Sequence, residues 1–221
     1  MITVWGRRNS VNVQKVLWAL EELDVPYTRE NAGGSFGGNK DADFLAMNPM
    51  GLVPVIRDGD VTMFESNAIV RWLAARYRDG LLRPKDPKGL AMAEQWMEWA
   101  QVNVGPAVGT LQMNLVRSPP EKRDHAAVAA ATERTRELVN IADQWIARHD
   151  WFAGRDFSFA DIVMGALFWR YTGFDIARPV TPHLDEWLDA LQLRDPFRRA
   201  VMAVPRAKYL ADWNRIEMET G

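Results

Sequence analysis

Residues 61–74, VTMFESNAIVRWLA, join a predicted strand to a predicted helix and decide how the first part of the chain folds. Valine, threonine, methionine and phenylalanine at positions 61–64 favour a strand, and Ile69, Val70 and Leu73 then recur at helical spacing. Ser66 is therefore expected near the N-terminus of the helix, where serine is a favoured capping residue.

This strand-to-helix junction also has the features of a binding site for a small zwitterion. The free N–H groups and the positive dipole end of a helix that starts near Ser66 can hold a carboxylate, and the Glu65 carboxylate can pair with an ammonium. A serine cap without any ligand explains the same residues. From this stretch alone, the cap is the simpler interpretation.

Around the junction, the first 78 residues predict short alternating strands and helices. Asp58-Gly59 has the composition of a tight hairpin turn between two of the strands. The predicted order is strand, helix, strand, helix, strand, strand, helix, over residues 2–5, 11–23, 27–31, 41–47, 53–57, 61–64 and 66–77. This order predicts a small α/β domain, residues 1–78, with a mixed sheet.

Beyond Asp79 the pattern becomes helical. Glycine and prolines at positions 80, 84 and 87 interrupt the chain, so we expect a linker over residues 79–88. An all-helical domain is expected over residues 89–221, with helices at about 88–117, 121–148, 158–171, 183–193 and 196–202.

The composition excludes several kinds of chemistry. The 221-residue chain has no cysteine, which rules out disulfides, thiolate metal sites and protein thiol nucleophiles. A net charge of -2 without a dense basic block indicates no nucleic-acid partner. The three histidines lack the spacing of metal ligands, so no metal site is expected. Without a signal-peptide pattern or a membrane-length apolar run, we expect a cytoplasmic protein with no membrane association.

Three segments together resemble the glutathione S-transferase family, and the resemblance extends over nearly the whole chain. They are NPMGLVP at residues 48–54, the Glu65-Ser66 pair, and GRDFSFADI at residues 154–162. The resemblance implies a thioredoxin-like N-terminal domain followed by an all-helical domain. It also implies glutathione as the cosubstrate.

The first two segments match the parts of the family that bind glutathione. The resemblance implies a cis bond between Val53 and Pro54, with the Val53 backbone holding the cysteinyl unit of glutathione. It implies that Glu65 and Ser66 hold the amino and carboxylate groups of the γ-glutamyl unit.

The third segment is interpreted as structural. Ser158 and Asp161 have the spacing of an N-cap residue and its reciprocal partner, and Phe157 and Ile162 have the spacing of a hydrophobic staple. We therefore expect Ser158 and Asp161 to stabilise the start of a helix and to take no part in catalysis.

A side-chain donor must keep the glutathione thiol ionised, and two residues are candidates for it. Ser10 lies between the first strand and the first helix, in a position that resembles the serine of the serine-type classes. Those classes commonly carry a proline two residues later, where this chain has Asn12. Asn12 can cap the helix and leave Ser10 free, or contact the sulfur itself. We favour Ser10, and the possibility that both only cap the helix stays open.

The glycine-rich segment at residues 33–40 lacks the spacing of a phosphate-binding loop. Lys40 is the first candidate for the glycyl carboxylate of glutathione, with Asn39 second, and a solvated surface lysine explains Lys40 equally well. The electrophile is expected in an apolar cleft between the domains, with lining residues drawn from Trp5, Phe36, Val108, Leu111 and Arg117. Trp5 and Leu111 fit a place in the core equally well. The resemblance also implies a homodimer, with Arg71, Glu94 and Glu98 as candidate interface contacts.

The predicted function is conjugation of the glutathione thiolate to a small hydrophobic electrophile, as in detoxification. A glutathione-dependent isomerase or dehalogenase is an alternative, although Asn9-Ser10-Val11 lacks the Ser-Ser-Cys run of the isomerase class. A non-catalytic binding or assembly protein with the same fold is another. The intact Val53-Pro54 and Glu65-Ser66 pairs favour ligand binding over the last alternative.

Overall fold

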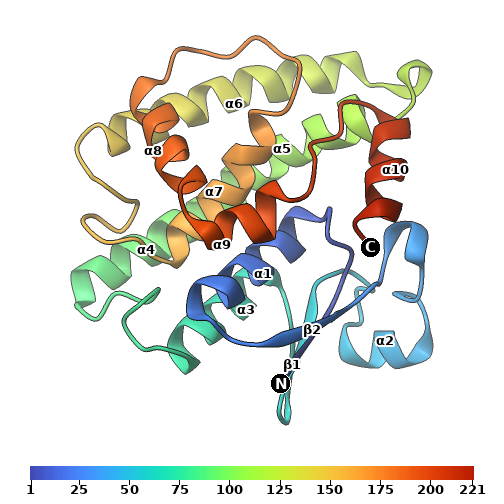
Figure 1. Ribbon diagram of the computed structural model, residues 1–221. Helices are drawn as coiled ribbons and strands as arrows, with labels where there is room; N and C mark the ends of the chain where they lie inside the picture. The colour runs from blue at the N-terminus through green and yellow to red at the C-terminus, as the bar shows by residue number, and fades with distance from the viewer.

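The computed structural model describes all residues from 1 to 221. In Figure 1 the strands and the helices α1, α2 and α3 form the lower part of the molecule, and the remaining helices stack above them. This arrangement is the predicted thioredoxin-like domain followed by an all-helical one. None of the helices combines the length and the apolar character needed to cross a bilayer.

The sheet has four strands in the order β2-β1-β3-β4. β1 runs parallel to β2 and antiparallel to β3, and β3 forms a hairpin with β4, so the sheet is mixed as expected. The strands are β1 Ile2–Trp5, β2 Tyr27–Glu30, β3 Val55–Asp58 and β4 Val61–Phe64. β3 starts two residues later than predicted, after Pro54, whose nitrogen has no hydrogen to donate to a strand ladder.

Helices α1 and α3 pack against each other, and α1 also contacts the helical domain. α1 is buried on all sides over residues 13–20, where Val13, Trp18 and Leu20 are fully inaccessible. A single hydrophobic core therefore continues from the sheet into the helices. The helices of this part are α1 Val11–Leu23, the short 3-10 turn η1 Gly34–Phe36, α2 Ala42–Met47 and α3 Ser66–Arg76.

The predicted long helix at 88–117 is a continuous helical run with two wider, π-helical turns. It consists of α4 Pro87–Trp99, η2 Ala100–Val104, α5 Gly105–Leu111 and η3 Gln112–Val116. Pro106 lies two residues after the end of η2, in the first turn of α5. Its nitrogen has no hydrogen to donate, and its ring cannot approach the carbonyl of Val102 closely. The π turn accommodates this proline without ending the helix.

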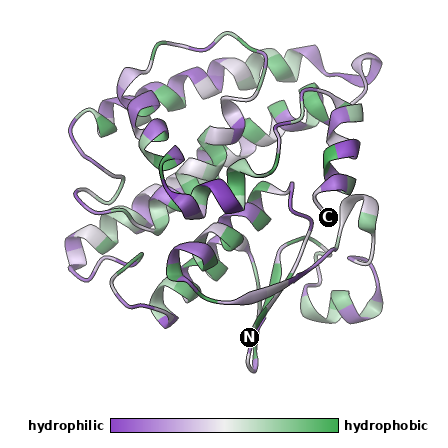
Figure 2. Ribbon diagram, in the orientation of Figure 1, coloured by the Kyte–Doolittle hydropathy of each residue, from purple (hydrophilic) through white to green (hydrophobic).

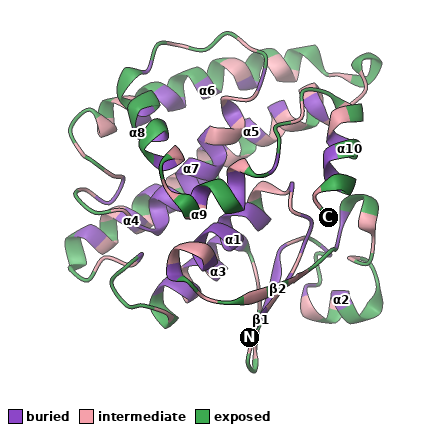
Figure 3. Cartoon of the chain, viewed as in Figure 1, coloured by how far each residue is buried: buried purple, intermediate pink, exposed green.

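Two long helices of the second domain differ in burial. α6 is amphipathic: Figure 2 shows hydrophilic and hydrophobic residues alternating along it, and Figure 3 shows one side exposed. α7 is buried along most of its length because its sequence, FADIVMGALFWRY, is apolar on every face. The elements after η3 are η4 Pro120–Lys122, α6 His125–Ile146, α7 Phe159–Tyr171, α8 Pro182–Gln192, α9 Asp195–Phe197, η5 Arg198–Met202 and α10 Leu210–Glu219.

The start of α7 carries the predicted cap. The Ser158 side chain and the Asp161 side chain satisfy each other's backbone N–H groups in a capping box. The Asp161 carboxylate also accepts hydrogen bonds from the backbone N–H of Phe152 and the indole of Trp187. Burial raises the pKa of Asp161 to about 6, and these hydrogen bonds oppose the rise. The structural interpretation of this segment is confirmed.

The last helix, α10, was missed by the sequence prediction. Its apolar side chains are few, and Trp213 and Ile216 are the two that it buries. In Figure 1 α10 lies beside the loop that follows β2, so the end of the chain returns to the first domain. This return brings α10 into contact with η1, in the glycine-rich segment at residues 33–40.

Candidate functional site

Ser10 is the N-cap residue of α1. Its backbone is extended, its carbonyl accepts the first helical hydrogen bond from Gln14, and its side chain caps nothing. The hydroxyl is half-buried and makes no hydrogen bond within the chain. A donor at this position is free to bond a ligand at the positive end of the helix dipole.

Asn12 lies in the first turn of the same helix, but it is exposed. Its side chain makes no hydrogen bond within the chain either, so the structure leaves both candidate donors unengaged. Because a half-buried donor is less solvated than an exposed one, a hydrogen bond from Ser10 is the stronger of the two.

The peptide bond between Val53 and Pro54 is cis, as predicted. Val53 precedes β3, and its own N–H and C=O take no part in the backbone hydrogen bonds of the chain. Its side chain packs on Gly6 at the end of β1, where an added Cβ would lie 3.2 Å from the Val53 Cβ. The free Val53 backbone can therefore pair with an extended peptide ligand.

Glu65 and Ser66 form the junction between β4 and α3. Glu65 has a φ of 69°, an uncommon value for a residue with a side chain, and its carboxylate is exposed. Ser66 is the first helical residue and is only 5% exposed. Strained backbone of this kind persists at ligand sites because the surrounding structure holds it in place. Here the turn presents the carboxylate of Glu65 beside the free N–H groups of the α3 N-terminus.

Lys15 was not identified from the sequence, yet it lies directly behind this junction. It is 1% exposed, and its Nζ is 3.4 Å from Oδ1 of Asn67 in the first turn of α3. Burial lowers the pKa of Lys15 to about 8, and the carboxylate of Glu65 opposes the shift. Asn67 in turn donates to Gln101 of the second domain. The buried ammonium of Lys15 therefore lies next to the residues of the candidate glutamyl site.

Asn39 and Lys40 are engaged within the chain. Nδ2 of Asn39 donates to the carbonyl of Gly51 at 2.7 Å, and Nζ of Lys40 donates to the carbonyl of Met50 at 3.1 Å. Both side chains thus anchor the loop that precedes the cis bond. Lys40 is exposed, so its charge remains available to an anion at the edge of the site.

Most residues predicted to line the electrophile cleft lie elsewhere. Val108 and Leu111 belong to the hydrophobic core, with 2% and 0% exposure. The cleft prediction for Val108 was wrong, and for Leu111 the core alternative holds. Helical periodicity identifies an apolar face but does not tell whether a core or a cleft covers it. Trp5 packs against Arg57 and donates its indole N–H to Glu30, on the outer side of the sheet.

The other two cleft candidates lie close to the end of the chain. Phe36 packs against the C-terminal Gly221, and the Arg117 guanidinium lies 5.2 Å from the ring centre of Trp213 in α10. An ion pair of 2.6 Å between Arg7 and Glu217 fastens α10 to the first domain, and Glu217 also accepts the backbone N–H of Ser35. α10 therefore closes one side of the space next to Ser10.

Two family models match the chain. Residues 9–76 match the N-terminal domain of glutathione S-transferases, and residues 109–195 match their C-terminal domain. Glutathione S-transferase GstB of Escherichia coli strain K12 is 44% identical over 204 residues, covering 91% of this chain and 98% of the relative.

Solved structures agree with this assignment. The theta class glutathione S-transferase from Xanthomonas axonopodis pv. citri, with glutathione bound, is similar at a TM-score of 0.88 and 41% identity, covering 91% of this chain and 97% of that one. Glutathione transferase F2 from Populus trichocarpa is similar at a TM-score of 0.82 and 25% identity, covering 92% and 98%. The chain belongs to the glutathione S-transferase family.

Proposed function

We propose that Ser10 activates glutathione, the cosubstrate of this glutathione S-transferase, for attack on small electrophiles. The observation that carries the proposal is the half-buried Ser10 hydroxyl at the start of α1, which makes no hydrogen bond within the chain. A thiol with a pKa of about 8.5 is only slightly ionised at neutral pH. Each unit of depression requires about 1.4 kcal/mol of extra stabilisation of the thiolate.

A hydrogen bond to the anion and the N-terminus of α1 together supply energy of this order. Charge-assisted hydrogen bonds are roughly twice as strong as neutral ones. The helix terminus adds about 0.3–1 kcal/mol for an anion near its first turn. The sulfur of glutathione is then the nucleophile. It forms a bond to an electrophilic carbon, and the leaving group departs with its electron pair.

The rest of glutathione is assigned to the neighbouring elements. In this proposal the Val53 backbone, before the cis bond to Pro54, pairs with the cysteinyl unit. Glu65 takes the glutamyl ammonium and Ser66 the glutamyl carboxylate. Lys40 and then Asn39 are the candidates for the glycyl carboxylate. The free backbone of Val53 and the exposed carboxylate of Glu65 support this orientation.

Replacing each candidate donor separately tests the activation. We expect Ser10→Ala to return the pKa of bound glutathione toward about 8.5 and to lower kcat/KM with an aryl halide by at least tenfold. The thiolate absorbance of the complex reports the pKa directly. Asn12→Ala is the matched comparison and should keep both values near wild type. If Asn12→Ala abolishes the thiolate signal while Ser10→Ala preserves it, the assignment to Ser10 is wrong.

We also propose that the protein is a cytosolic homodimer, as is usual in the family, with domains at residues 1–78 and 89–221 and a linker at 79–88. The last helix of the sheet part ends at Arg76 and α4 begins at Pro87, which supports that division. Arg71 pairs with Glu94 and Glu98 of its own chain. Sedimentation velocity tests the dimer, and a single species with the mass of one chain contradicts it.

A further inference from the structure

A small pocket lies beneath α10, beside the residue that precedes Ser10. Its walls come from α7, η3, the segment after η5, and α10 itself. The pocket offers about 20 Å³ to the centres of water-sized groups. Since one water needs about 10–15 Å³ on this measure, the pocket has room for a polar atom group of about the size of one water.

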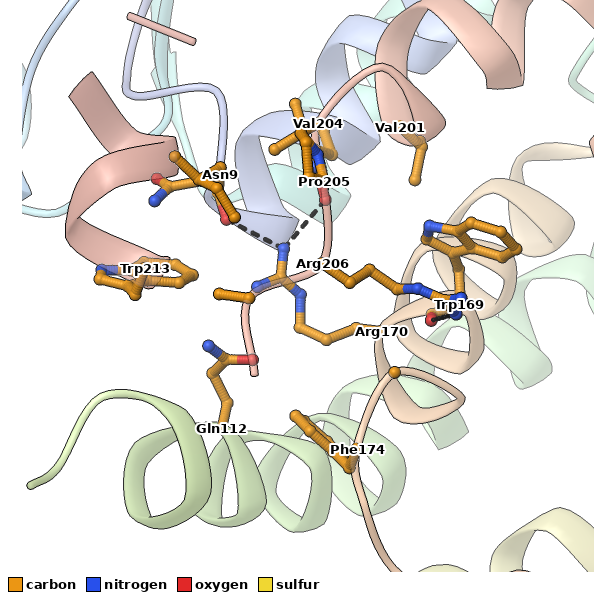
Figure 4. A pocket seen from close by; sticks show the side chains of 14 residues that line it. Asn9, Gln112, Trp169, Arg170, Phe174, Val201, Val204, Pro205, Arg206 and Trp213 are labelled. Carbon is orange, nitrogen blue, oxygen red and sulfur yellow. Dashed lines mark hydrogen bonds between the residues drawn. The ribbon is translucent and has the colours of Figure 1, made fainter. Parts of the chain in front are cut away.

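Arg170 reaches across this pocket from the last turn of α7. In Figure 4 its guanidinium lies near the middle of the view, to the right of Trp213 and above Gln112, with dashed lines to its hydrogen-bond partners. Nη2 donates to the carbonyl of Asn9 at 2.9 Å and to Oε1 of Gln14 at 3.1 Å. Both partners are neutral, so no carboxylate balances the charge of Arg170.

Arg170 and two more arginines lie close to the indole ring of Trp213. The guanidinium carbons of Arg7, Arg117 and Arg170 lie 5.6, 5.2 and 5.8 Å from the ring centre of Trp213. Glu217, paired with Arg7, is the one carboxylate that an ion pair brings to this group. We call Arg7, Arg117, Arg170 and Trp213 the arginine cluster.

The arginine cluster carries more positive charge than the chain compensates. Three guanidinium groups face one carboxylate, so two positive charges remain unbalanced. Burial, together with the nearby charges of Arg7 and Arg117, lowers the pKa of Arg170 to about 10. Keeping like charges together in a partly desolvated site is unfavourable unless an anion joins them.

Asn9 supplies an independent sign of a missing ligand. It lines the pocket, is 2% exposed, and neither its side-chain nitrogen nor its oxygen has a hydrogen-bond partner. Leaving buried polar atoms unpaired is unfavourable, and native structures rarely do so without a reason. The amide N–H groups of Asn9 are free to donate to an oxyanion bound beside them, and the backbone carbonyl of Asn9 accepts from Arg170.

We propose that this pocket binds a carboxylate of the second substrate, so that the enzyme prefers acidic electrophiles over neutral ones. The inference rests on the proposed function, and it specifies the chemistry of the electrophile. Arginine matches a carboxylate with two parallel hydrogen bonds. Because Asn9 directly precedes Ser10, a carboxylate held here directs the rest of the molecule toward the thiolate.

The carboxylate itself does not react. The glutathione sulfur forms a bond to the electrophilic carbon, the bond from that carbon to the leaving group breaks, and the leaving group takes the electron pair. The pocket only binds and orients, so its contribution is a difference in kcat/KM between charged and neutral substrates of similar shape.

Iodoacetate and iodoacetamide make a matched pair because they share the reacting carbon and the leaving group and differ in charge. The variant Arg117→Met removes one charge from the arginine cluster without breaking any hydrogen bond or ion pair of that side chain. After each rate is corrected for the uncatalysed reaction, we expect the wild type to have a higher kcat/KM for iodoacetate than for iodoacetamide. Arg117→Met should lose about tenfold in kcat/KM for iodoacetate and less than twofold for iodoacetamide.

Two further variants sharpen the result. Asn9→Ala should also lower the preference for iodoacetate, since it removes the unpaired amide. Arg134→Met removes an exposed arginine on α6, outside the pocket, and should leave both substrates unchanged. Equal losses for the two substrates in Arg117→Met, or no preference in the wild type, overturn the proposal.

Binding of the two products separates this proposal from the catalytic one. S-carboxymethylglutathione and S-(carbamoylmethyl)glutathione differ by the same charge, and calorimetry measures their affinities without turnover. We expect tighter binding of the carboxymethyl compound to the wild type and an equal affinity of both in Arg117→Met. If the binding preference is present but neither iodo compound is turned over, the proposed conjugation fails and the pocket stands. If turnover occurs without any binding preference, the pocket proposal fails alone.

Discussion

Each end of α7 carries a buried charge, and the two charges differ in how completely the chain pairs them. At the first turn, the Asp161 carboxylate is fully buried and accepts hydrogen bonds from the Phe152 and Ser158 backbones, the Ser158 hydroxyl and the Trp187 indole. At the last turn, Arg170 joins two other arginines with one carboxylate among them. Both charges suit the helix dipole, so the dipole does not explain the difference.

The two ends of α7 differ in whether groups of the same chain supply all the hydrogen bonds and counter-charges that the buried charge requires. Both carboxylate oxygens of Asp161 accept hydrogen bonds from donors of the same chain. A buried charge whose role is structural requires such complete hydrogen bonding. The arginine cluster leaves charge and the amide of Asn9 without partners. A buried charge that the chain satisfies serves stability, and one that the chain leaves unsatisfied is available to a ligand.

The largest expected effect is at the satisfied end. Asp161→Ala removes four accepted hydrogen bonds and leaves the buried N–H groups of Phe152 and Ser158 unpaired. We expect the free energy of unfolding to fall by about 3–5 kcal/mol, as measured by urea denaturation. Asp156→Ala, an exposed carboxylate in the preceding loop, is the control and should change it by less than about 0.5 kcal/mol. A loss under about 1 kcal/mol in Asp161→Ala contradicts its structural role.

Lys15 is an intermediate case, because it is buried with a single long hydrogen bond and a nearby carboxylate. Its pKa of about 8 in the folded protein lies below the ordinary value of about 10.4. Between these values the unfolded chain binds more protons than the native one, so stability rises with pH. Below about pH 8, burial of the charged amine lowers the free energy of unfolding by a constant amount. This loss becomes smaller as the pH increases toward about 10.4, because the buried amine is then neutral.

Comparison with Lys15→Met isolates this titration from all others. The free energy of unfolding of the wild type should rise by about 3 kcal/mol relative to the variant between pH 8 and pH 10.4. Urea denaturation at several pH values measures the difference. A difference that does not vary with pH means that Lys15 is not held in a site that disfavours its charge.

Ser158→Ala tests the cap with a smaller change. The Ser158 hydroxyl accepts the N–H of Ala160 and donates to the Asp161 carboxylate. Its loss should lower the free energy of unfolding by about 1–2 kcal/mol. Ser118→Ala, a half-buried serine between two helices, is the matched control and should be close to neutral. At the N-terminal end of α7, the loss in free energy of unfolding should therefore increase with the number of hydrogen bonds removed.

The sequence predicted one end of α7 and missed the other for a physical reason. The cap at Ser158 and Asp161, the cis bond before Pro54 and the turn at Glu65 are built from neighbouring residues, so their pattern is visible in the sequence. The arginine cluster joins residues 7, 117, 170 and 213, and residue 217 pairs with it; only the tertiary fold brings these residues together. No local spacing identifies such a site.

Other differences have the same origin. Lys15 lies in a helix whose apolar pattern is strong, and its burial follows from α3 and α7 packing on both sides of α1. α10 has few apolar residues and is held in place by the ion pair between Arg7 and Glu217. The cleft prediction for Val108 was wrong because periodicity does not distinguish a cleft from a core. Contacts between distant segments decided each of these cases.

The most direct test of the contrast is the free energy of unfolding of Arg117→Met with and without S-carboxymethylglutathione. Without the ligand, the variant should be within about 0.5 kcal/mol of the wild type or more stable, because one repulsive charge is gone. With saturating ligand, the wild type should be more stable by about 1.4 kcal/mol, which corresponds to tenfold tighter binding. If Arg117→Met is clearly less stable without the ligand and saturating ligand adds no further difference, the arginine cluster serves the fold and the account is wrong.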